Sequence, residues 1–252
     1  MEKNTFDLVV LCWILLGCLI FPILLFVTAP YGRYTTPKWG ITISNRTGWI
    51  LMEVPALLVF LYFIASGKAD KNAVVWIIVL LFTIHYTNRS LIYPFRIKTK
   101  GKKMPLLIAI LAIVFNTVNS YVNGYYLSTL QNMYSITWLT DVRFIVGILL
   151  FITGMILNIS ADEKLIHLRK SNSNGYQIPY GRMFNIISCP NFFGEIVEWF
   201  GFAVLCWSLP ALSFFVWTIC NLLPRALDHH RWYKRQFADY PINRKAVFPY
   251  LL

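Results

Sequence analysis

Charged side chains are scarce in this chain. Only 13% of its 252 residues are Asp, Glu, Lys or Arg, whereas an average soluble domain is about 25% charged. With 57% hydrophobic residues and a mean hydropathy of +0.56, this scarcity argues against a soluble globular protein and predicts a polytopic membrane protein. Acidic residues are rarest, and the net charge is +12. The basic residues do not form a soluble module, so we do not expect nucleic acid as a partner.

Several ligand-binding motifs are also absent. The five cysteines show no CxxC or Cys/His spacing, and the four histidines show no HExxH pattern, so neither a metal site nor a structural disulfide is expected. The chain has no G-x-G-x-x-G and no Walker-type loop. A bound nucleotide would therefore be held by helix ends and loops rather than by a Rossmann site.

The N-terminal segment lacks the marks of a secretory signal. MEKNTFD has no basic n-region and no small-residue cleavage site. The apolar run that follows is long enough to span a bilayer. We therefore expect a retained transmembrane helix.

Apolar runs dominate the chain and occupy residues 7–28, 46–66, 72–88, 105–128, 139–160 and 191–223. A bilayer core needs about twenty helical residues, and the last run is about thirty residues long. Pro210 lies inside it and would interrupt a helix, which divides the run into helices at 191–208 and 210–223, the second of them short. The sequence therefore predicts an all-α fold of seven transmembrane helices in a single domain, residues 1–252, with no internal repeat.

The loops predict the orientation. The segment Arg89–Met104 is the most basic and is expected to face the cytoplasm. In a seven-helix arrangement the loops at 29–45 and 161–190 and the C-terminal tail share that side, and all are basic. The loop near 129–141 lies on the other side and contains no Lys or Arg. A six-helix arrangement would put the basic tail on the wrong side.

Two polar residues stand out within the spans. Glu53 lies about seven residues into the second span, which is roughly 10 Å below the cytoplasmic edge. A carboxylate there costs on the order of 3 kcal/mol, so Glu53 is either a polar contact between helices or an acid that faces a ligand. Tyr86 lies at similar depth in the third span, either as an interfacial aromatic or as a partner of Glu53. Such a pair would donate hydrogen bonds to a carbonyl oxygen on which negative charge develops.

Further polar residues recur at helical spacing near the cytoplasmic side. One set is Asn158, Asp162 and Arg169, and a second is Asn191, Glu195 and Glu198. A third set, Arg225, His229 and Tyr233, is spaced by four, so that a helix would present its members together. Solvated helix ends and cytoplasmic positive charge are the alternatives, but arginine and histidine also suit phosphate oxygens. We interpret the sets as walls of one site for a polar cofactor.

Several motifs resemble the steroid 5-alpha-reductase family over nearly the whole chain. The N-terminal half carries Tyr31-Gly32-Arg33, Trp49 with Glu53-Val54-Pro55, and His85-Tyr86 with Arg89 and Tyr93. The C-terminal half carries Asn158 with Asp162, Tyr176 with Ile178-Pro179, Asn191-Phe192-Phe193-Gly194-Glu195 with Glu198-Trp199, Trp207-Ser208-Leu209-Pro210-Ala211, Arg225-Ala226, His229-His230-Arg231, Tyr233, Asp239-Tyr240-Pro241 and Arg244-Lys245-Ala246.

This resemblance implies a seven-helix membrane enzyme whose cavity opens to the cytoplasm. We also expect the protein to be a monomer. It would use NADPH to reduce the delta-4 double bond of a 3-oxo steroid or a steroid-like lipid, with hydride going to C5 and a proton to C4. The ketone would be held by Glu53 and Tyr86, and Trp49 and Tyr93 would line the steroid cavity. The cofactor, held mainly by residues 158–252, would contact Asn158, Asp162, Arg169, Asn191, Glu195, Trp199, Arg225, His229, Tyr233 and Lys102. Membrane lipids would surround the enzyme in the endoplasmic reticulum of a eukaryote or the inner membrane of a bacterium.

The chain departs from the family pattern at three positions. Met52 replaces the usual Gln before the acid, which makes the substrate pocket less polar. Gln177 replaces an Arg that follows Tyr176 and so removes a cofactor contact. Arg182 replaces the second Gly of a pair, and we expect it to compensate for that loss.

Three other functions remain open on the sequence. An enoyl-thioester or polyprenol reductase would share mainly the C-terminal motifs and would need a pocket for a long chain. A methyltransferase of isoprenylated cysteine would use S-adenosylmethionine and would not need Glu53. A small-molecule transporter would place polar groups near the bilayer midplane within an inverted repeat, whereas here they gather at one face.

Overall fold

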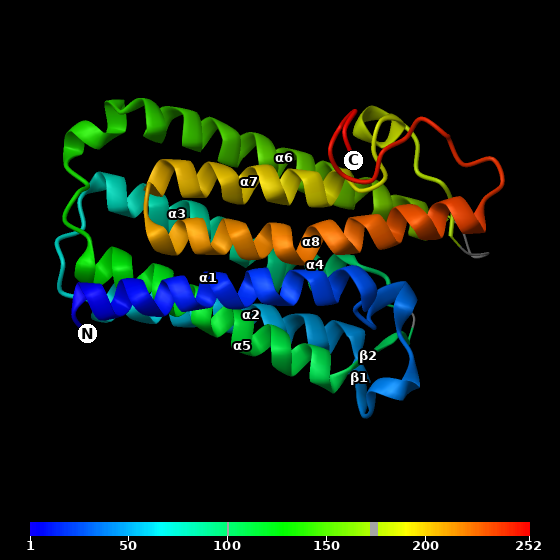
Figure 1. Ribbon diagram of the computed structural model, residues 1–252, viewed down its shortest axis with the longest axis horizontal. Coiled ribbons are helices and arrows are strands. Elements are labelled where there is room, and N and C mark those ends of the chain that lie inside the picture. The colour runs from blue at the N-terminus through cyan, green and yellow to red at the C-terminus, as the bar shows by residue number, and fades with distance from the viewer. Residues whose placement is uncertain (100, 172–175) are drawn as a thin grey trace.

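The computed structural model describes residues 1–99, 101–171 and 176–252. Long helices run side by side along the longest axis of the molecule (Figure 1). They are α1 (Lys3–Phe26), α2 (Asn45–Ser66), α3 (Ala73–Thr87), α5 (Leu106–Tyr125), α6 (Val142–Ser171), α7 (Pro190–Cys206) and α8 (Leu209–Gln236). The strongest packing joins α6 to α7, α2 to α5, and α8 to both α1 and α7. The helical fold predicted from the apolar runs is confirmed.

Short elements connect the helices, mostly at the end of the bundle where α8 terminates. They are η1 (Gly32–Tyr34), η2 (Pro37–Trp39), β1 (Thr42–Ser44), η3 (Asn88–Ile92), α4 (Tyr93–Arg96), β2 (Lys103–Pro105), η4 (Tyr126–Leu130), η5 (Ile136–Thr140) and η6 (Arg182–Asn185). Strands β1 and β2 pair antiparallel, with Ile43 opposite Met104. Because these strands directly precede α2 and α5, their pairing holds the beginnings of both helices together.

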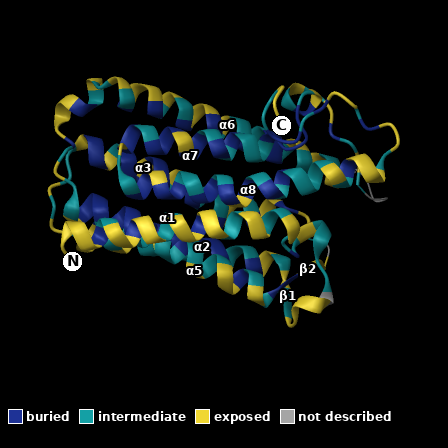
Figure 2. Cartoon of the chain, in the orientation of Figure 1, coloured by how far each residue is buried: buried dark blue, intermediate teal, exposed yellow. Residues whose placement is uncertain are grey.

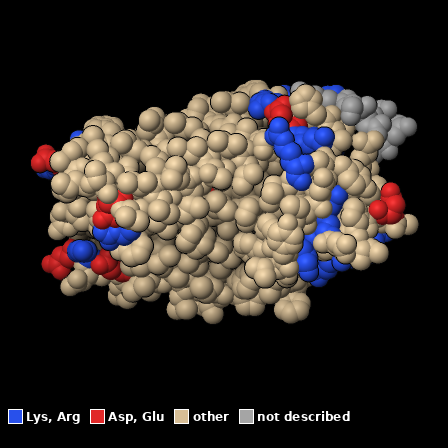
Figure 3. Space-filling model, turned by 90° about the horizontal axis from the view of Figure 1, so that it is seen from above, with Lys and Arg blue, Asp and Glu red and all other residues tan. Residues whose placement is uncertain are grey.

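The helices are long and apolar enough to cross a membrane at six places, which are Lys3–Phe26, Asn45–Ser66, Ala73–Arg96, Leu106–Leu130, Val142–Arg169 and Leu209–Gln236. Few positions of α1 are buried against the rest of the chain, as Figure 2 shows. Charged side chains gather toward the ends of the face in Figure 3, and its broad middle is uncharged. The protein is therefore a multi-pass membrane protein.

The last apolar run is divided as expected, but its second helix is not short. Helix α7 ends at Cys206, Trp207 adopts a left-handed conformation with φ of 43°, and the Ser208 side chain caps α8. Pro210 then lies in the first turn of α8, where the missing N–H costs little. Helix α8 continues for 28 residues to Gln236, so the prediction that it stops at residue 223 was wrong. The polar residues after Pro224 extend the helix because one face of that extension packs inward.

The third span is also longer than its apolar run. After α3 the chain makes a π turn, η3, in which the Tyr93 N–H donates to the Asn88 carbonyl, and α4 continues to Arg96. The Ser90 hydroxyl donates to the carbonyl of Tyr86 at 2.6 Å and ties the turn to α3. The segment predicted as a loop, Arg89–Met104, is thus helical in its first half. Single π turns within helices often occur at functional sites.

Glycines bring α6 and α7 into backbone contact. Gly147 and Gly154 on α6 face Gly201 and Gly194 on α7, and an added Cβ at any of the four would collide with backbone atoms of the opposite helix. Small residues of this kind let membrane helices approach closely. We call these four residues the glycine seam, and it brings the polar ends of α6 and α7 together.

The glycine seam leads to a prediction about stability. Gly201→Ala inserts a methyl group against the backbone near Phe151, and overpacking of this kind costs about 1–3 kcal/mol. We expect a lower midpoint of thermal unfolding for the purified protein in detergent. Phe200→Leu, on the exposed side of the same helix, should leave the midpoint unchanged. An unchanged midpoint for Gly201→Ala would show that the seam is not tight.

Candidate active site

A cavity of about 560 Å³ runs through the bundle. Its apolar part is lined from α1, α5 and α8 by Trp13, Leu16, Ile20, Leu24, Ile108, Leu111, Ala112, Val114, Phe115, Phe214 and Trp217. Its polar part is lined mainly from α2, α3, η3, α6, α7, α8 and the loop between α1 and α2. The cavity therefore has one compartment suited to a lipid-like body and another suited to a polar ligand.

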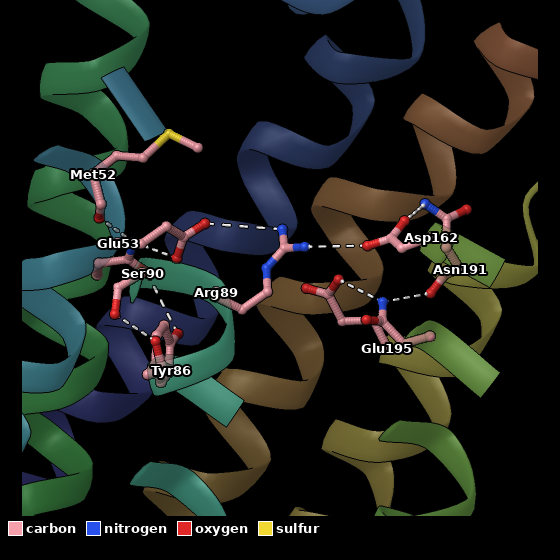
Figure 4. Close-up of polar contacts among 10 residues, drawn as sticks. Met52, Glu53, Tyr86, Arg89, Ser90, Asp162, Asn191 and Glu195 are labelled. Carbon is pink, nitrogen blue, oxygen red and sulfur yellow. Dashed lines mark hydrogen bonds and ion pairs between the residues drawn. The ribbon is translucent and has the colours of Figure 1, made fainter. Parts of the chain in front are cut away.

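Arg89 lies between the two sides of the polar part (Figure 4). Its guanidinium nitrogens are 3.8 Å from Glu53 Oε1 on α2 and 3.6 Å from Asp162 Oδ2 on α6. The rings of Trp49 and Tyr93 lie 4.9 and 5.0 Å from the guanidinium carbon. Arg89 therefore joins α2 to α6 across the cavity, and two aromatic rings hold it there.

Glu53 and Tyr86 are both buried, with exposed fractions of 8% and 3%, and both line the cavity. They are linked through Asn116 on α5. The Asn116 amide donates to Glu53 Oε2 at 3.5 Å and to the Met52 carbonyl at 2.5 Å, and the Tyr86 hydroxyl donates to Asn116 Oδ1 at 3.5 Å. Glu53 therefore contacts neighbouring helices and also lines the cavity, and its role toward a ligand stays a prediction.

The predicted polar set on α6 and α7 forms a connected network (Figure 4). The Asn158 amide donates to the Asn191 carbonyl at 2.9 Å and to Glu195 Oε2 at 3.4 Å, and the Asn191 amide donates to Asp162 Oδ1 at 3.0 Å. Asn158 is the one predicted site residue that does not line the cavity, since it supports Asn191 and Glu195 from behind.

Glu198 does not join the network formed by the polar residues of α6 and α7. It has no exposed surface, and its Oε1 lies 2.7 Å from Nδ1 of His85. The seven-residue spacing from Asn191 suggested a shared face, but the side chain turns toward α3 instead. Trp199 is also buried, lines the cavity, and packs its ring against His85 and Phe214, with centroids 4.7 and 4.0 Å away.

Helix α8 presents Arg225, His229 and Tyr233 to the cavity together, as their spacing predicted. The guanidinium carbon of Arg225 lies 3.4 Å from the centroid of the Tyr31 ring. His229 stacks between Tyr34 and Phe192, with centroids 5.5 and 5.7 Å away.

Tyr34 also makes a polar contact with this face of α8. Its hydroxyl lies 3.3 Å from Nδ1 of His229. Burial raises the pKa of Tyr34 to about 12, so at neutral pH the phenol keeps its proton. It can donate that proton to Nδ1 when the neutral imidazole carries its own proton on Nε2.

The remaining predicted residues also face the cavity. Lys102 and Arg169 line its outer end and are exposed to solvent. Trp49 and Tyr93 line it too, but the contact that their rings make is with Arg89. Thirteen of the fourteen predicted site residues thus share one cavity, while the function of each stays a prediction. Arg182, expected to compensate for Gln177, does not line the cavity, and neither does Gln177.

Sequence reasoning missed two central residues. Arg89 belongs to the most basic segment and to a family motif, but the sequence analysis gave it no role in the site. Asn116 is a polar residue within an apolar run, and the cost that singled out Glu53 could have singled it out as well.

Cys189 lines the cavity without offering a nucleophile. It lies just before α7 and is buried. Burial raises the pKa of its thiol to about 12, so the reactive thiolate is not populated at neutral pH. The site thus offers hydrogen-bond donors and charges rather than covalent catalysis by this cysteine.

Comparison with known proteins decides the family. The family model described as 3-oxo-5-alpha-steroid 4-dehydrogenase matches residues 102–252. Steroid 5-alpha-reductase DET2 of Solanum lycopersicum is 41% identical over 254 residues, which cover 99% of this chain and 98% of the relative. The chain belongs to the steroid 5-alpha-reductase family. A second relative of this family, 3-oxo-5-alpha-steroid 4-dehydrogenase 1 of Homo sapiens, is 40% identical over 237 residues, 93% of this chain and 91% of the relative. The family expected from the motifs is confirmed, and the protein is an oxidoreductase.

The position of Arg89 leads to a second prediction. Arg89→Met removes the cation between Glu53 and Asp162, and loss of one partner of a buried pair costs about 3–5 kcal/mol. We expect a large fall in the thermal unfolding midpoint. The triple variant Arg89→Met, Glu53→Gln, Asp162→Asn should recover part of it, because no uncompensated charge remains.

Arg96→Met is the matched control. Arg96 forms its ion pair with Glu163 at the surface, where such pairs contribute little, so this variant should unfold near the wild-type midpoint. If Arg89→Met were as stable as Arg96→Met, Arg89 would not hold the two sides of the site together.

Proposed function

We propose that the protein uses NADPH to reduce the delta-4 double bond of 3-oxo steroids to the 5-alpha product. The observation that carries the proposal is the cavity itself. Glu53 and Tyr86 line it together with apolar side chains of α1, α5 and α8 and with polar side chains of α6, α7 and α8. The type of reaction is taken from the names of the relatives, and the lining of the cavity is consistent with it.

The apolar compartment suits a rigid, ring-fused lipid. Its lining includes the indole rings of Trp13 and Trp217, which pack 4.6 Å apart, and the Phe115 ring 5.2 Å from Trp217. Aromatic rings of this kind offer broad apolar surfaces with a small loss of side-chain freedom. A steroid whose body occupies this compartment would direct its A-ring ketone toward Glu53 and Tyr86.

Tyr86 and Glu53 would hold the ketone oxygen. Within the described part of the chain, the Tyr86 hydroxyl makes only a long hydrogen bond, 3.5 Å to Asn116, so its proton is available to a stronger acceptor. Glu53 would add a second hydrogen bond when its carboxyl group takes up a proton, and Arg89 would then keep Asp162 as its charged partner. Negative charge grows on this oxygen as the double bond is reduced, and donors fixed in a buried site stabilise the enolate-like transition state more than the ground state.

The polar compartment fits a phosphorylated cofactor. Nη1 of Arg225 is buried and has no hydrogen-bond partner among the described residues, and no described carboxylate forms an ion pair with Arg225 or Arg169. Buried guanidinium N–H groups without acceptors suit phosphate oxygens. Arg225 and Arg169 would hold phosphates, and Asn191, Glu195 and His229 would contact the riboses and nicotinamide. Bound NADPH would supply hydride to C5.

We also propose seven spans and a cytoplasmic cofactor side. Helix α7 has 17 residues, which span about 26 Å, and it packs between α6 and α8. Among the described residues, Lys3, Lys68, Lys71 and Arg143 are the only Lys and Arg at the end of the bundle that carries the N-terminus. The other end is basic and receives the polar compartment, so the positive-inside rule puts it in the cytoplasm.

The same proposal includes the domain organisation, the oligomeric state and the membrane in which the protein resides. The chain would act as a single domain and as a monomer, with residues 158–252 contributing most of the cofactor contacts. It would reside in the endoplasmic reticulum of a eukaryote or the inner membrane of a bacterium.

The reaction is tested with purified protein in detergent. Absorbance at 340 nm should fall when NADPH and a delta-4-3-ketosteroid such as testosterone or progesterone are both present, and the 5-alpha product should accumulate in equal amount. A saturated 3-ketosteroid serves as the control and should leave NADPH unconsumed. No consumption with any delta-4-3-ketosteroid would refute the proposed substrate class.

The ketone-binding pair is tested by Glu53→Gln and Tyr86→Phe. Tyr86→Phe removes a preorganised donor to a developing oxyanion, and Glu53→Gln replaces the carboxyl donor with a far less acidic amide, so we expect kcat to fall by about 10²–10³-fold in each variant. Tyr62→Phe removes a phenol hydroxyl from an exposed position of α2 and should keep the wild-type rate. Full activity in both site variants would show that the ketone is held elsewhere.

A further inference from the structure

A histidine and a glutamate form a buried ion pair inside the bundle, next to Tyr86. Nδ1 of His85 on α3 lies 2.7 Å from Oε1 of Glu198 on α7, and the two side chains are 6% and 0% exposed. The second carboxylate oxygen, Oε2, is buried without a hydrogen-bond partner among the described residues. The imidazole is therefore the group that compensates this buried acid by direct contact.

Aromatic rings pack around the pair. The centroids of the Trp199 and Tyr86 rings lie 4.7 and 5.1 Å from the centroid of the His85 ring. A buried pair of this kind adds little stability over apolar residues of similar volume, because both groups lose their hydration. Loss of its proton would leave an uncompensated carboxylate, which is strongly unfavourable. In the resting protein the pair therefore keeps that proton, on the imidazole or on the carboxyl group.

The imidazole also lines the cavity, beside the group that would hold the ketone. His85 directly precedes Tyr86 on α3, and both residues belong to the cavity lining. Because Nδ1 contacts Glu198, Nε2 is the ring nitrogen left to face a ligand. A ketone oxygen held by Tyr86 is bonded to C3, and C4 is the next carbon of the steroid ring. The imidazole and the phenol therefore approach adjacent parts of the same ring.

Reduction of the double bond needs a proton as well as a hydride. The inference rests on the proposed function, in which hydride addition at C5 leaves an enolate with negative charge shared between C4 and the ketone oxygen. Tyr86 and Glu53 would serve the oxygen, and the guanidinium of Arg89 does not release a proton. A histidine oriented by a carboxylate is a frequent proton donor in enzymes.

We propose that His85 donates the proton to C4 and that Glu198 is its positioning residue. The Nε2–H bond breaks, an electron pair of the enolate forms the C4–H bond, and the ketone double bond is restored. Nδ1 keeps or takes over the proton shared with Glu198, so that a neutral imidazole is left beside a carboxylate. Solvent then returns a proton to the pair through the polar part of the cavity.

Hydrogen exchange without cofactor tests this assignment on the full-length protein in detergent. A saturated 5-alpha-3-ketosteroid is incubated in D₂O, and deuterium at C4 is followed by NMR. In the reverse of the proposed step the neutral imidazole removes the C4 proton, so wild-type protein should exchange it faster than buffer alone. His85→Gln should lower the protein-catalysed rate by about 10²-fold or more, the usual contribution of a general acid or base. No exchange above the buffer rate with wild-type protein would overturn the inference.

Isotope effects on the complete reaction give a readout that a purely structural defect would not change. In His85→Gln the proton must come from water, so proton transfer becomes the slow step. The solvent isotope effect in D₂O should rise, and the effect of deuterium at the transferred position of NADPH should fall toward unity. A variant that only misplaces the substrate would slow hydride transfer instead and would keep the NADPH effect.

Two further variants separate chemistry from folding. His85→Gln combined with Glu198→Gln leaves no buried charge, so it should unfold near the wild-type midpoint and still lack the exchange. His167→Gln is the matched control, since His167 pairs with Glu163 at the surface and outside the cavity lining, and it should keep wild-type exchange and turnover. Wild-type exchange in the double variant would overturn the inference while the proposed function stands. Wild-type protein that reduces no delta-4-3-ketosteroid would overturn the proposed function, and this inference with it.

Discussion

The architecture of the site depends on one cation held between two acids on different helices. Arg89 lies between Glu53 on α2 and Asp162 on α6, and the side chains that would hold substrate and cofactor belong to those two sides. Charges in a low-dielectric interior interact strongly, but each costs free energy to desolvate. Three groups that neutralise one another in part can be retained inside a membrane protein, whereas any one alone would be expelled or neutralised. Arg89 thus lets two acids face the cavity.

Backbone packing provides the other constraint. The glycine seam brings α6 and α7 so close that the amide of Asn158 reaches the backbone of Asn191 and the carboxylate of Glu195. In lipid there is no hydrophobic force to hold helices together, so close contact and interhelical hydrogen bonds take its place. The same approach that stabilises the helix pair also builds the polar wall of the site. Both the stability of the helix pair and the proposed chemistry therefore require small residues in the glycine seam.

The two compartments of the cavity explain why the chain is both apolar and strongly basic. Apolar rings and aliphatic side chains of α1, α5 and α8 suit a lipid-like body, and basic residues at the other side suit phosphate. Among the described residues, no carboxylate forms an ion pair with Arg33 or Arg169, and such unpaired charge is unfavourable unless an anion binds there. On the proposed function, the cationic lining would also attract a soluble anionic cofactor.

The sequence alone determined the helical membrane fold and most of the spans, because hydropathy and loop charge are local properties. Depth, helical spacing and the family resemblance together named thirteen side chains that share the cavity. It singled out Glu53 and Tyr86 by depth. Tertiary structure decided which groups meet. Asn116 reaches Glu53 from 63 residues away, and Glu198 turns to His85 across 113 residues. It also decided that α8 runs on to Gln236, since the inward face of its polar end finds partners only in the folded bundle. Such contacts depend on how each helix is rotated and how closely its neighbour approaches, and no local pattern carries that information.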